Sequence, residues 1–213
     1  MNDALRSDGP DDAIERSGSL AWPDHLIAGV DEVGRGPLAG PVVAAAVVLD
    51  PERVPFGLND SKALDRTTRE RLASEVAASA RAVAVVSLPA RTIDRLNIRG
   101  ATLEAMRRAI LALAVPPFRV LVDGRDTVPS LAAPCETIVK GDARSVSIAA
   151  ASIIAKVSRD RMMAVADSTW PQYGFAGHVG YPTPTHRKAL EEYGPSPIHR
   201  RSFGTVRRLL EAR

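Results

Sequence analysis

Two short apolar segments joined by a tight connection constrain this chain more than any other feature. Residues 26–31 (Leu-Ile-Ala-Gly-Val-Asp) and 42–49 (Val-Val-Ala-Ala-Ala-Val-Val-Leu) have the length and apolar character of buried strands. The connection between them carries a Gly-Arg-Gly-Pro turn and Gly40, and it is too short to hold a crossover helix. We therefore expect the two strands to pair antiparallel.

The rest of the chain alternates between helical and strand patterns. Helices are expected at residues 65–80, 90–97, 99–113, 145–167, 183–192 and 205–211, and strands at 82–88, 119–123 and 137–139. Pro116-Pro117 ends the helix before it, because proline cannot continue a helix. This order predicts an α/β fold with a mixed central sheet flanked by helices and a small helical C-terminal region at about 170–213.

The first residues differ in composition from the rest. Residues 1–22 are polar, rich in Gly, Ser and Asp, and lack periodicity. We expect a disordered acidic tail at 1–22 and one folded domain at 23–213. Residues 1–25 hold six acids against two arginines, so of the net charge of +3 the remainder carries about +7. A basic body favours a polyanionic partner such as nucleic acid, although solvated helices are often basic too.

Nothing in the sequence suggests a membrane or an export route. No apolar run approaches the roughly 18 residues of a membrane span, and the N-terminus lacks a basic region followed by an apolar one. The single Cys135 has no partner for an internal disulfide, and we expect its thiol to pack rather than react. The expectation is a cytoplasmic monomer.

Acidic side chains stand at the ends of three predicted elements. Asp31 and Glu32 end the first strand, Asp123 ends another, and Asp142 lies just before the long helix. Neighbouring acids inside a strand would point to opposite faces, but at a strand end we expect a turn to let both reach one pocket. Clustered carboxylates need a cation, and hard oxygen ligands favour magnesium or manganese. Taken singly, each acid is more commonly a turn cap or a solvated side chain.

The Gly34-Arg35-Gly36 turn, which follows the acid pair, has features suited to binding a phosphate. Its glycines let backbone N–H groups approach a ligand closely, and the guanidinium supplies positive charge. Acids beside a basic turn suggest a divalent metal working on a phosphate. Such sites hydrolyse phosphodiesters by a two-metal route, in which one ion activates water and the other stabilises the leaving oxygen.

Further motifs follow the Ile27–Pro37 stretch in a fixed order. They are Val120-Leu121-Val122-Asp123-Gly124, Lys140-Gly141-Asp142, the helical Ser147–Asp160, Gly180-Tyr181-Pro182-Thr183 and Tyr193-Gly194-Pro195-Ser196-Pro197-Ile198-His199-Arg200. In this order and spacing the set closely resembles the bacterial ribonuclease HII family, the type 2 ribonucleases H, over about residues 26–203. The resemblance implies a ribonuclease H-like fold whose C-terminal part faces the substrate.

The resemblance also implies an activity. Family members are endonucleases that cleave the RNA strand of RNA/DNA hybrids, including 5′ of single ribonucleotides embedded in duplex DNA, and so serve ribonucleotide removal. The products carry 5′-phosphate and 3′-hydroxyl ends. Asp31, Glu32, Asp123 and Asp142 match the catalytic, metal-binding positions, with Mn²⁺ or Mg²⁺ as cofactor. Asp31 is our choice for the carboxylate that touches both ions.

Substrate contacts follow from the same resemblance. The 2′-hydroxyl is the group that marks RNA against DNA at one site. Family precedent assigns its recognition to the backbone of Gly34, Arg35 and Gly36 and to Tyr181, which packs against the following sugar. A phosphate-contacting loop is matched by Asn59, Ser61 and Lys62.

Other charged residues have less specific interpretations. Lys156 and Asp160 lie four apart on the long helix, which favours a structural ion pair over direct chemistry. The basic residues near the C-terminus could contact the nucleic-acid backbone or could simply be solvated. They are His186, His199, Arg200 and Arg201.

Two alternatives remain at this point. A type 3 ribonuclease H shares the early acid pair and glycine-rich turn, but that family carries a folded N-terminal extension that the short polar tail does not replace. A catalytically silent hybrid-binding module is disfavoured, because a pure binder would gain by replacing acids near phosphates. Val33 departs from the family pattern, in which a small residue such as alanine is common.

Overall fold

The computed structural model of the chain describes residues 26–212, so the tail expected at 1–22 lies outside the described residues. Five strands form one sheet in the order β3-β2-β1-β4-β5. Their bounds are β1 Ile27–Val33, β2 Val42–Val48, β3 Ala82–Leu88, β4 Arg119–Asp123 and β5 Cys135–Ile138. The sheet is mixed, because β1 and β2 pair antiparallel, as the short connection predicted, while β1 and β4 run parallel.

The helices begin and end close to the expected residues. Their bounds are α2 Arg66–Ser79, α3 Ala90–Leu111, α4 Val146–Thr169, α5 Phe175–His178, α6 Pro184–Tyr193 and α7 Gly204–Glu211, with the 3₁₀ helices η1 Gly141–Ala143 and η2 Pro171–Tyr173. Asp65, Ser145 and Thr183 accept hydrogen bonds from the first turns of α2, α4 and α6. Asn97, with φ 58°, interrupts α3 where the sequence predicted two separate helical segments.

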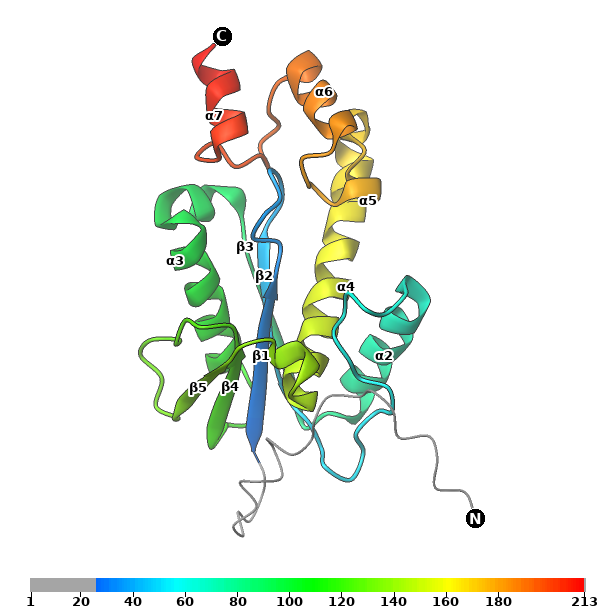
Figure 1. The fold of residues 1–213 in the computed structure, drawn as a ribbon, viewed down its shortest axis with the longest axis vertical. Coiled ribbons are helices and arrows are strands. Elements are labelled where there is room, and N and C mark those ends of the chain that lie inside the picture. The colour runs from blue at the N-terminus through cyan, green and yellow to red at the C-terminus, as the bar shows by residue number, and fades with distance from the viewer. Residues whose placement is uncertain (1–25, 213) are drawn as a thin grey trace.

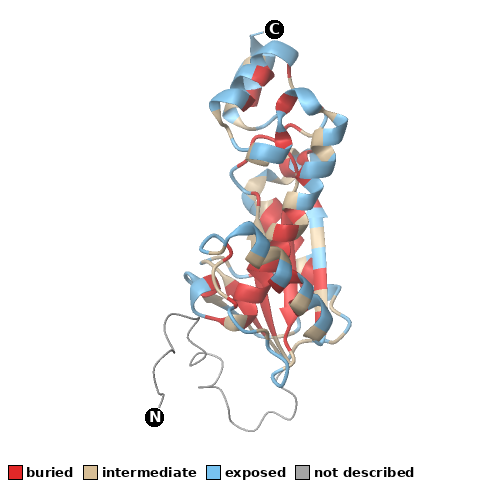
Figure 2. Ribbon diagram, turned by 90° about the vertical axis from the view of Figure 1, so that its right-hand side faces the viewer, coloured by how far each residue is buried: buried red, intermediate tan, exposed pale blue. Residues whose placement is uncertain are grey.

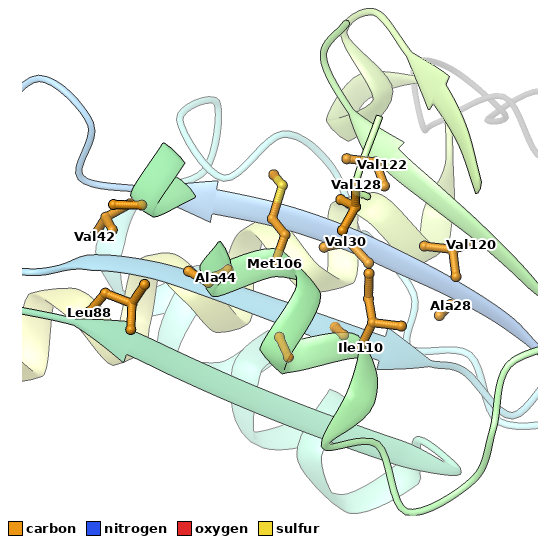
Figure 3. Packing of buried hydrophobic residues seen from close by; sticks show 14 of the residues in the cluster. Ala28, Val30, Val42, Ala44, Leu88, Met106, Ile110, Val120, Val122 and Val128 are labelled. Carbon is orange, nitrogen blue, oxygen red and sulfur yellow. The ribbon is translucent and has the colours of Figure 1, made fainter. Parts of the chain in front are cut away.

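The sheet is covered on both faces. The α3 side of the core contains Val30, Ala44 and Met106, and Figure 3 shows Met106 and Ile110 of α3 reaching down onto the strands. The opposite face packs against α2 and α4, which stand on the other side of the sheet from α3 in Figure 1. Alternate residues of each central strand therefore enter different halves of the core. This confirms the predicted mixed sheet flanked by helices.

The C-terminal region forms a smaller layer at one end of the molecule. Helices α5, α6 and α7 surround the loop that joins β1 to β2, and they expose more of their surface than the main core does (Figures 1 and 2). Two small apolar clusters, one around Phe175 and one around Val206, hold this layer together. Among the described residues no helix is long and apolar enough to cross a bilayer.

Candidate active site

The acid pair of β1 divides between the two faces of the sheet. Because β1 continues to Val33, Asp31 and Glu32 leave the strand in opposite directions. Asp31 is 5% exposed, and its carboxylate accepts a hydrogen bond from Ser152 of α4. Glu32 is half-buried and lines a pocket on the α3 side with Arg35. The expectation that the first strand ends at Asp31 is thus corrected, because β1 continues through both acids to Val33.

Asp123 connects the other predicted acids. It ends β4, the strand next to β1, and its Oδ1 accepts a hydrogen bond of 2.7 Å from the Gly141 N–H. That bond ties β4 to η1, in which Asp142 is buried. Asp123 acts electrostatically on Asp31, Glu32 and Asp142 alike. The structure therefore gathers the four acids around Asp123, and we call them the acid cluster.

The acid cluster is unfavourable as a set of bare anions. Burial raises the pKa of Asp31 well above its ordinary value, and the charges of Glu32 and Asp123 raise it further. The pKa of Glu32 is raised by burial despite the opposing charge of Arg35. Burial, followed by the charge of Asp123, also raises the pKa of Asp142. A positive charge among these carboxylates would favour their ionised forms.

Two basic side chains supply part of that charge. Lys62 Nζ lies 3.7 Å from Asp142 Oδ2, and Arg35 Nη1 lies 3.3 Å from Glu32 Oε1. Burial alone would lower the pKa of Lys62, but four carboxylates outweigh it and raise that pKa. Among the described residues no three acidic, imidazole or thiol side chains converge tightly enough to form a finished metal site. The donors are all hard oxygens that repel one another, so their chemistry fits a magnesium or manganese ion.

The Gly34-Arg35-Gly36 loop lies beside Tyr181. Gly34 is buried with φ +90°, whereas Arg35 and Gly36 are exposed. A Cβ on Gly36 would lie 3.4 Å from Cε1 of Tyr181, and the Tyr181 side chain is itself 43% exposed. The predicted 2′-hydroxyl sensors, which come from opposite ends of the chain, therefore form one surface.

The predicted phosphate-contacting residues of the 59–62 loop differ in their exposure to solvent. The Lys62 side chain is 78% exposed, and Asn59 Oδ1 accepts a hydrogen bond of 2.8 Å from the Asp60 N–H. Ser61 is buried, and its hydroxyl lies 2.9 Å from that of Ser152. Ser152 thus joins this loop to Asp31, a role that the sequence analysis missed. Its signal was a polar residue within the apolar stretch of the long helix.

Four basic residues near the C-terminus were expected at the surface, either in contact with the nucleic-acid backbone or solvated. The structure contradicts this for three of them. His186, His199 and Arg200 are buried, so they are neither solvated nor available to a nucleic-acid backbone. Only Arg201 of the four is exposed. The Lys156–Asp160 ion pair, in contrast, is present with a separation of 2.8 Å between Nζ and Oδ1.

The two buried histidines connect Tyr181 to the C-terminal segment. The Ser196 N–H donates to His199 Nδ1 at 2.9 Å, so His199 carries its proton on Nε2. That proton is donated to His186 Nε2 at 3.0 Å, which leaves Nδ1 of His186 to donate to the Tyr181 carbonyl at 2.9 Å. The chain of hydrogen bonds needs both rings neutral, and protonation of His199 would break it.

This chain predicts a loss of stability in acid. Burial, and then the neighbouring His186, lowers the pKa of His199 from 6.5 to about 4. Between these values the unfolded state binds more protons than the folded state, so the free energy of unfolding falls by about 1.4 kcal/mol per pH unit as the pH decreases. Urea unfolding at about pH 7 and about pH 5 measures the slope. His199→Gln should show a shallower slope, and equal slopes in the two proteins would contradict the assignment.

Comparison with known proteins adds independent findings. Residues 28–206, which include every predicted site residue, match the family model described as Ribonuclease HII. A ribonuclease HII of Rhizobium johnstonii is 56% identical over 201 residues, covering 93% of this chain and 86% of the relative. One from Bartonella tribocorum is 60% identical over 182 residues, covering 85% and 81%. The crystal structure of ribonuclease H2 from Pyrococcus horikoshii OT3 has a TM-score of 0.75 and 31% identity, covering 87% of this chain and 97% of that one.

Proposed function

The chain belongs to the ribonuclease HII family, and from this premise we propose that it cleaves duplex DNA 5′ of single embedded ribonucleotides. It is an endoribonuclease of the ribonuclease H kind, which acts on the RNA strand of RNA/DNA hybrids. Membership of the type 2 family decides against the type 3 alternative and against a silent binding module. The finer proposal depends above all on one observation: the exposed Arg35 and Gly36 lie beside Tyr181 and next to the acid cluster.

The acid cluster supplies the chemistry of the proposal. Asp31, Glu32, Asp123 and Asp142 would hold divalent cations, Mg²⁺ or Mn²⁺, which when bound activate water and stabilise the leaving oxygen. Asp123 lies among the other three acids, and Ser152 fixes Asp31 by a hydrogen bond. Lys62, which already faces these carboxylates, is free at its exposed end to turn to a substrate phosphate. Hydrolysis in this arrangement leaves a 5′-phosphate and a 3′-hydroxyl.

The surface beside the acid cluster would select the substrate. The backbone of Gly34, Arg35 and Gly36 meets the ribonucleotide, and the ring of Tyr181 packs on the next sugar. Asn59 and Ser61 shape the loop that carries Lys62. We assign the whole range 23–213 to this catalytic domain, with 170–213 facing the substrate. The chain would act as a monomer in the cytoplasm on hybrids and ribonucleotide-containing DNA.

A cleavage assay tests the proposed function. A duplex labelled at one end and containing one ribonucleotide is incubated with the protein and magnesium, manganese or a chelator, beside an all-DNA duplex of the same sequence. We expect one cut, 5′ of the ribonucleotide, with either metal and none with chelator. Cleavage of long hybrids without cleavage of the single-ribonucleotide duplex would leave the family activity intact but contradict the finer proposal.

Tyr181 should affect the substrate preference and not the chemistry. Tyr181→Ala removes the ring that would pack on the deoxyribose, so we expect cleavage at a single ribonucleotide to fall by about tenfold or more. The metal requirement should not change, because a phenol is a poor ligand for a hard cation. Steady-state rates on the single-ribonucleotide duplex with each metal measure both effects.

Tyr181→Phe is the matched variant. It keeps the ring and should keep most of the activity if packing on the sugar is what matters. A phenylalanine variant as slow as the alanine variant would transfer the role to the hydroxyl. Full activity in both variants would show that Tyr181 only packs within the protein.

A further inference from the structure

Two buried arginines lie beneath the β1–β2 loop without a carboxylate partner. Arg159 of α4 and Arg200 are fully buried, and no described acid forms an ion pair with either. Burial lowers the pKa of Arg200 to about 9 and also lowers that of Arg159. Nη1 of Arg159 has no hydrogen-bond partner among the described residues. Burying two guanidinium groups without a carboxylate partner lowers the stability of the fold, because each loses its hydration. These two arginines are therefore candidates for a functional role.

Both guanidinium groups bind backbone carbonyls of the loop. Arg159 Nε donates to the Pro41 carbonyl at 3.0 Å, and its Nη2 donates to that of Ala39 at 3.3 Å. Arg200 Nε donates to the Gly40 carbonyl at 3.0 Å. Nη1 of Arg200 donates to the Arg35 carbonyl at 2.8 Å, and Nη2 donates to that of Gly34. Arg159 therefore binds only the C-terminal part of the loop, at Ala39 and Pro41. Arg200 binds that part at Gly40 and, in addition, the glycine-rich start of the loop.

The hydrogen bonds that Arg200 donates to the loop fix the direction of the Arg35 and Gly36 N–H groups. In a planar trans peptide the C=O of one residue and the N–H of the next point in opposite directions. Because the Gly34 and Arg35 carbonyls point inward to Arg200, the N–H groups of Arg35 and Gly36 point outward. Both residues are exposed, and within the described part of the chain neither N–H donates a hydrogen bond. The loop therefore presents two adjacent, outward-facing donors.

The rest of the loop is held by the same C-terminal segment. The Arg200 N–H donates to the Leu38 carbonyl at 2.8 Å, and the Gly40 N–H donates to the Ile198 carbonyl at 2.9 Å. The Leu38 N–H reaches the Gly180 carbonyl at 2.8 Å, next to Tyr181. The two donors and the Tyr181 ring are consequently held on one rigid unit, which favours recognition because little order is lost on binding.

We propose that Arg200 is a positioning residue for substrate recognition, which turns the Arg35 and Gly36 N–H groups outward to bind an oxygen acceptor of the nucleic acid. The acceptor is a ribose 2′-hydroxyl or a backbone phosphate oxygen, both of which accept from paired N–H donors. The inference rests on the proposed function, since it explains how that site selects ribonucleotides. Lysine at position 200 would keep the charge but could not hold two carbonyls in the same fork.

Binding measurements on matched variants test the proposal. Fluorescence anisotropy in chelator gives Kd for an all-DNA duplex and for the same duplex with one ribonucleotide, using the wild type, Arg200→Lys and Arg159→Lys. We expect the wild type to prefer the ribonucleotide and Arg200→Lys to lose about tenfold of that preference, the effect of one or two hydrogen bonds. Arg159→Lys removes an equally buried guanidinium and should keep the preference within about twofold.

The outcomes separate the alternatives. Selective loss on the ribonucleotide duplex assigns the donors to the 2′-hydroxyl, while weaker binding of both duplexes by Arg200→Lys alone assigns them to a phosphate. Equal behaviour of the two lysine variants overturns the positioning role. A wild type without preference contradicts the proposed selectivity, and the inference then stands only if Arg200→Lys weakens binding of both duplexes. An Arg200→Lys protein that binds both duplexes as tightly as the wild type overturns the inference alone.

A measurement on the wild type covers the case in which Arg200→Lys does not fold. In ¹⁵N-labelled protein, the Arg35 and Gly36 amide resonances should shift when the ribonucleotide duplex is added. The Leu38 amide, which is already bound to the Gly180 carbonyl, is the internal reference. If the Arg35 and Gly36 amides shift no more than that of Leu38, the proposal is wrong.

Discussion

Asp31→Asn and Asp123→Asn are each expected to abolish cleavage of an RNA/DNA hybrid while the protein stays folded. Each substitution removes one carboxylate from the acid cluster, and with it charge stabilisation of the transition state that is worth several kcal/mol. The rate should fall by about three orders of magnitude or more. Single-turnover cleavage under saturating Mg²⁺ and Mn²⁺ measures the loss.

Stability should move in the other direction. The pKa of Asp31 is raised in the folded state, so its ionised form at neutral pH opposes folding, and an uncharged amide of the same shape removes that opposition. We expect the melting temperature to hold or rise, and hybrid affinity to hold or rise because a negative charge near phosphate is lost. Near-normal turnover in either variant would remove the acid cluster from the mechanism.

A charge-matched control distinguishes the acid cluster from a general effect of charge. Glu136 lies on β5 of the same sheet, is exposed, and pairs with Arg119. Glu136→Gln changes the net charge by the same amount as the two test substitutions. Its cleavage rate should stay within about twofold of the wild type, because a surface ion pair contributes little.

Local patterns predicted the parts of the fold that depend on neighbours in sequence. The apolar run at 42–49 became β2, and the periodic segments on either side of Asn97 became the two arms of α3. Asp123 and Asp142 were expected at element ends and are found there. In each case the decisive signal, an apolar run followed by a turn residue, lies within a few positions.

The sequence did not reveal where the charged residues of the C-terminal segment would lie. Arg200 is buried because its guanidinium meets carbonyls at Gly34 and Arg35, more than 160 positions away. Residue type alone predicts exposure for arginine, and the Gly/Pro-rich segment around Arg200 has no periodicity to correct that expectation. The divergence of Asp31 and Glu32 was missed for a related reason, since the end of a strand depends on its partner strand.

Gly29→Ala is the substitution for which we expect the largest loss of stability. Gly29 lies in β1 opposite Val47, and a Cβ there would come within 2.0 Å of the Ser147 backbone carbon and 2.4 Å of the Ile148 nitrogen. These atoms belong to the first turn of α4, so no side-chain rotation can relieve the clash. Either β1 or α4 must move, at an expected cost of about 3 kcal/mol or more in the free energy of unfolding. Urea unfolding followed by circular dichroism measures it.

The same displacement should reach the acid cluster. α4 follows Asp142 directly through its capping residue Ser145, and it carries Ser152, which binds Asp31. A shift of its first turn would separate Asp142 from Asp123, so cleavage should fall even at temperatures where Gly29→Ala is fully folded. Gly177→Ala is the control, because a Cβ there meets nothing within 4 Å, and its stability should stay within about 0.5 kcal/mol of the wild type. A Gly29→Ala protein as stable as Gly177→Ala would mean that β1 and α4 do not pack as closely as this fold requires.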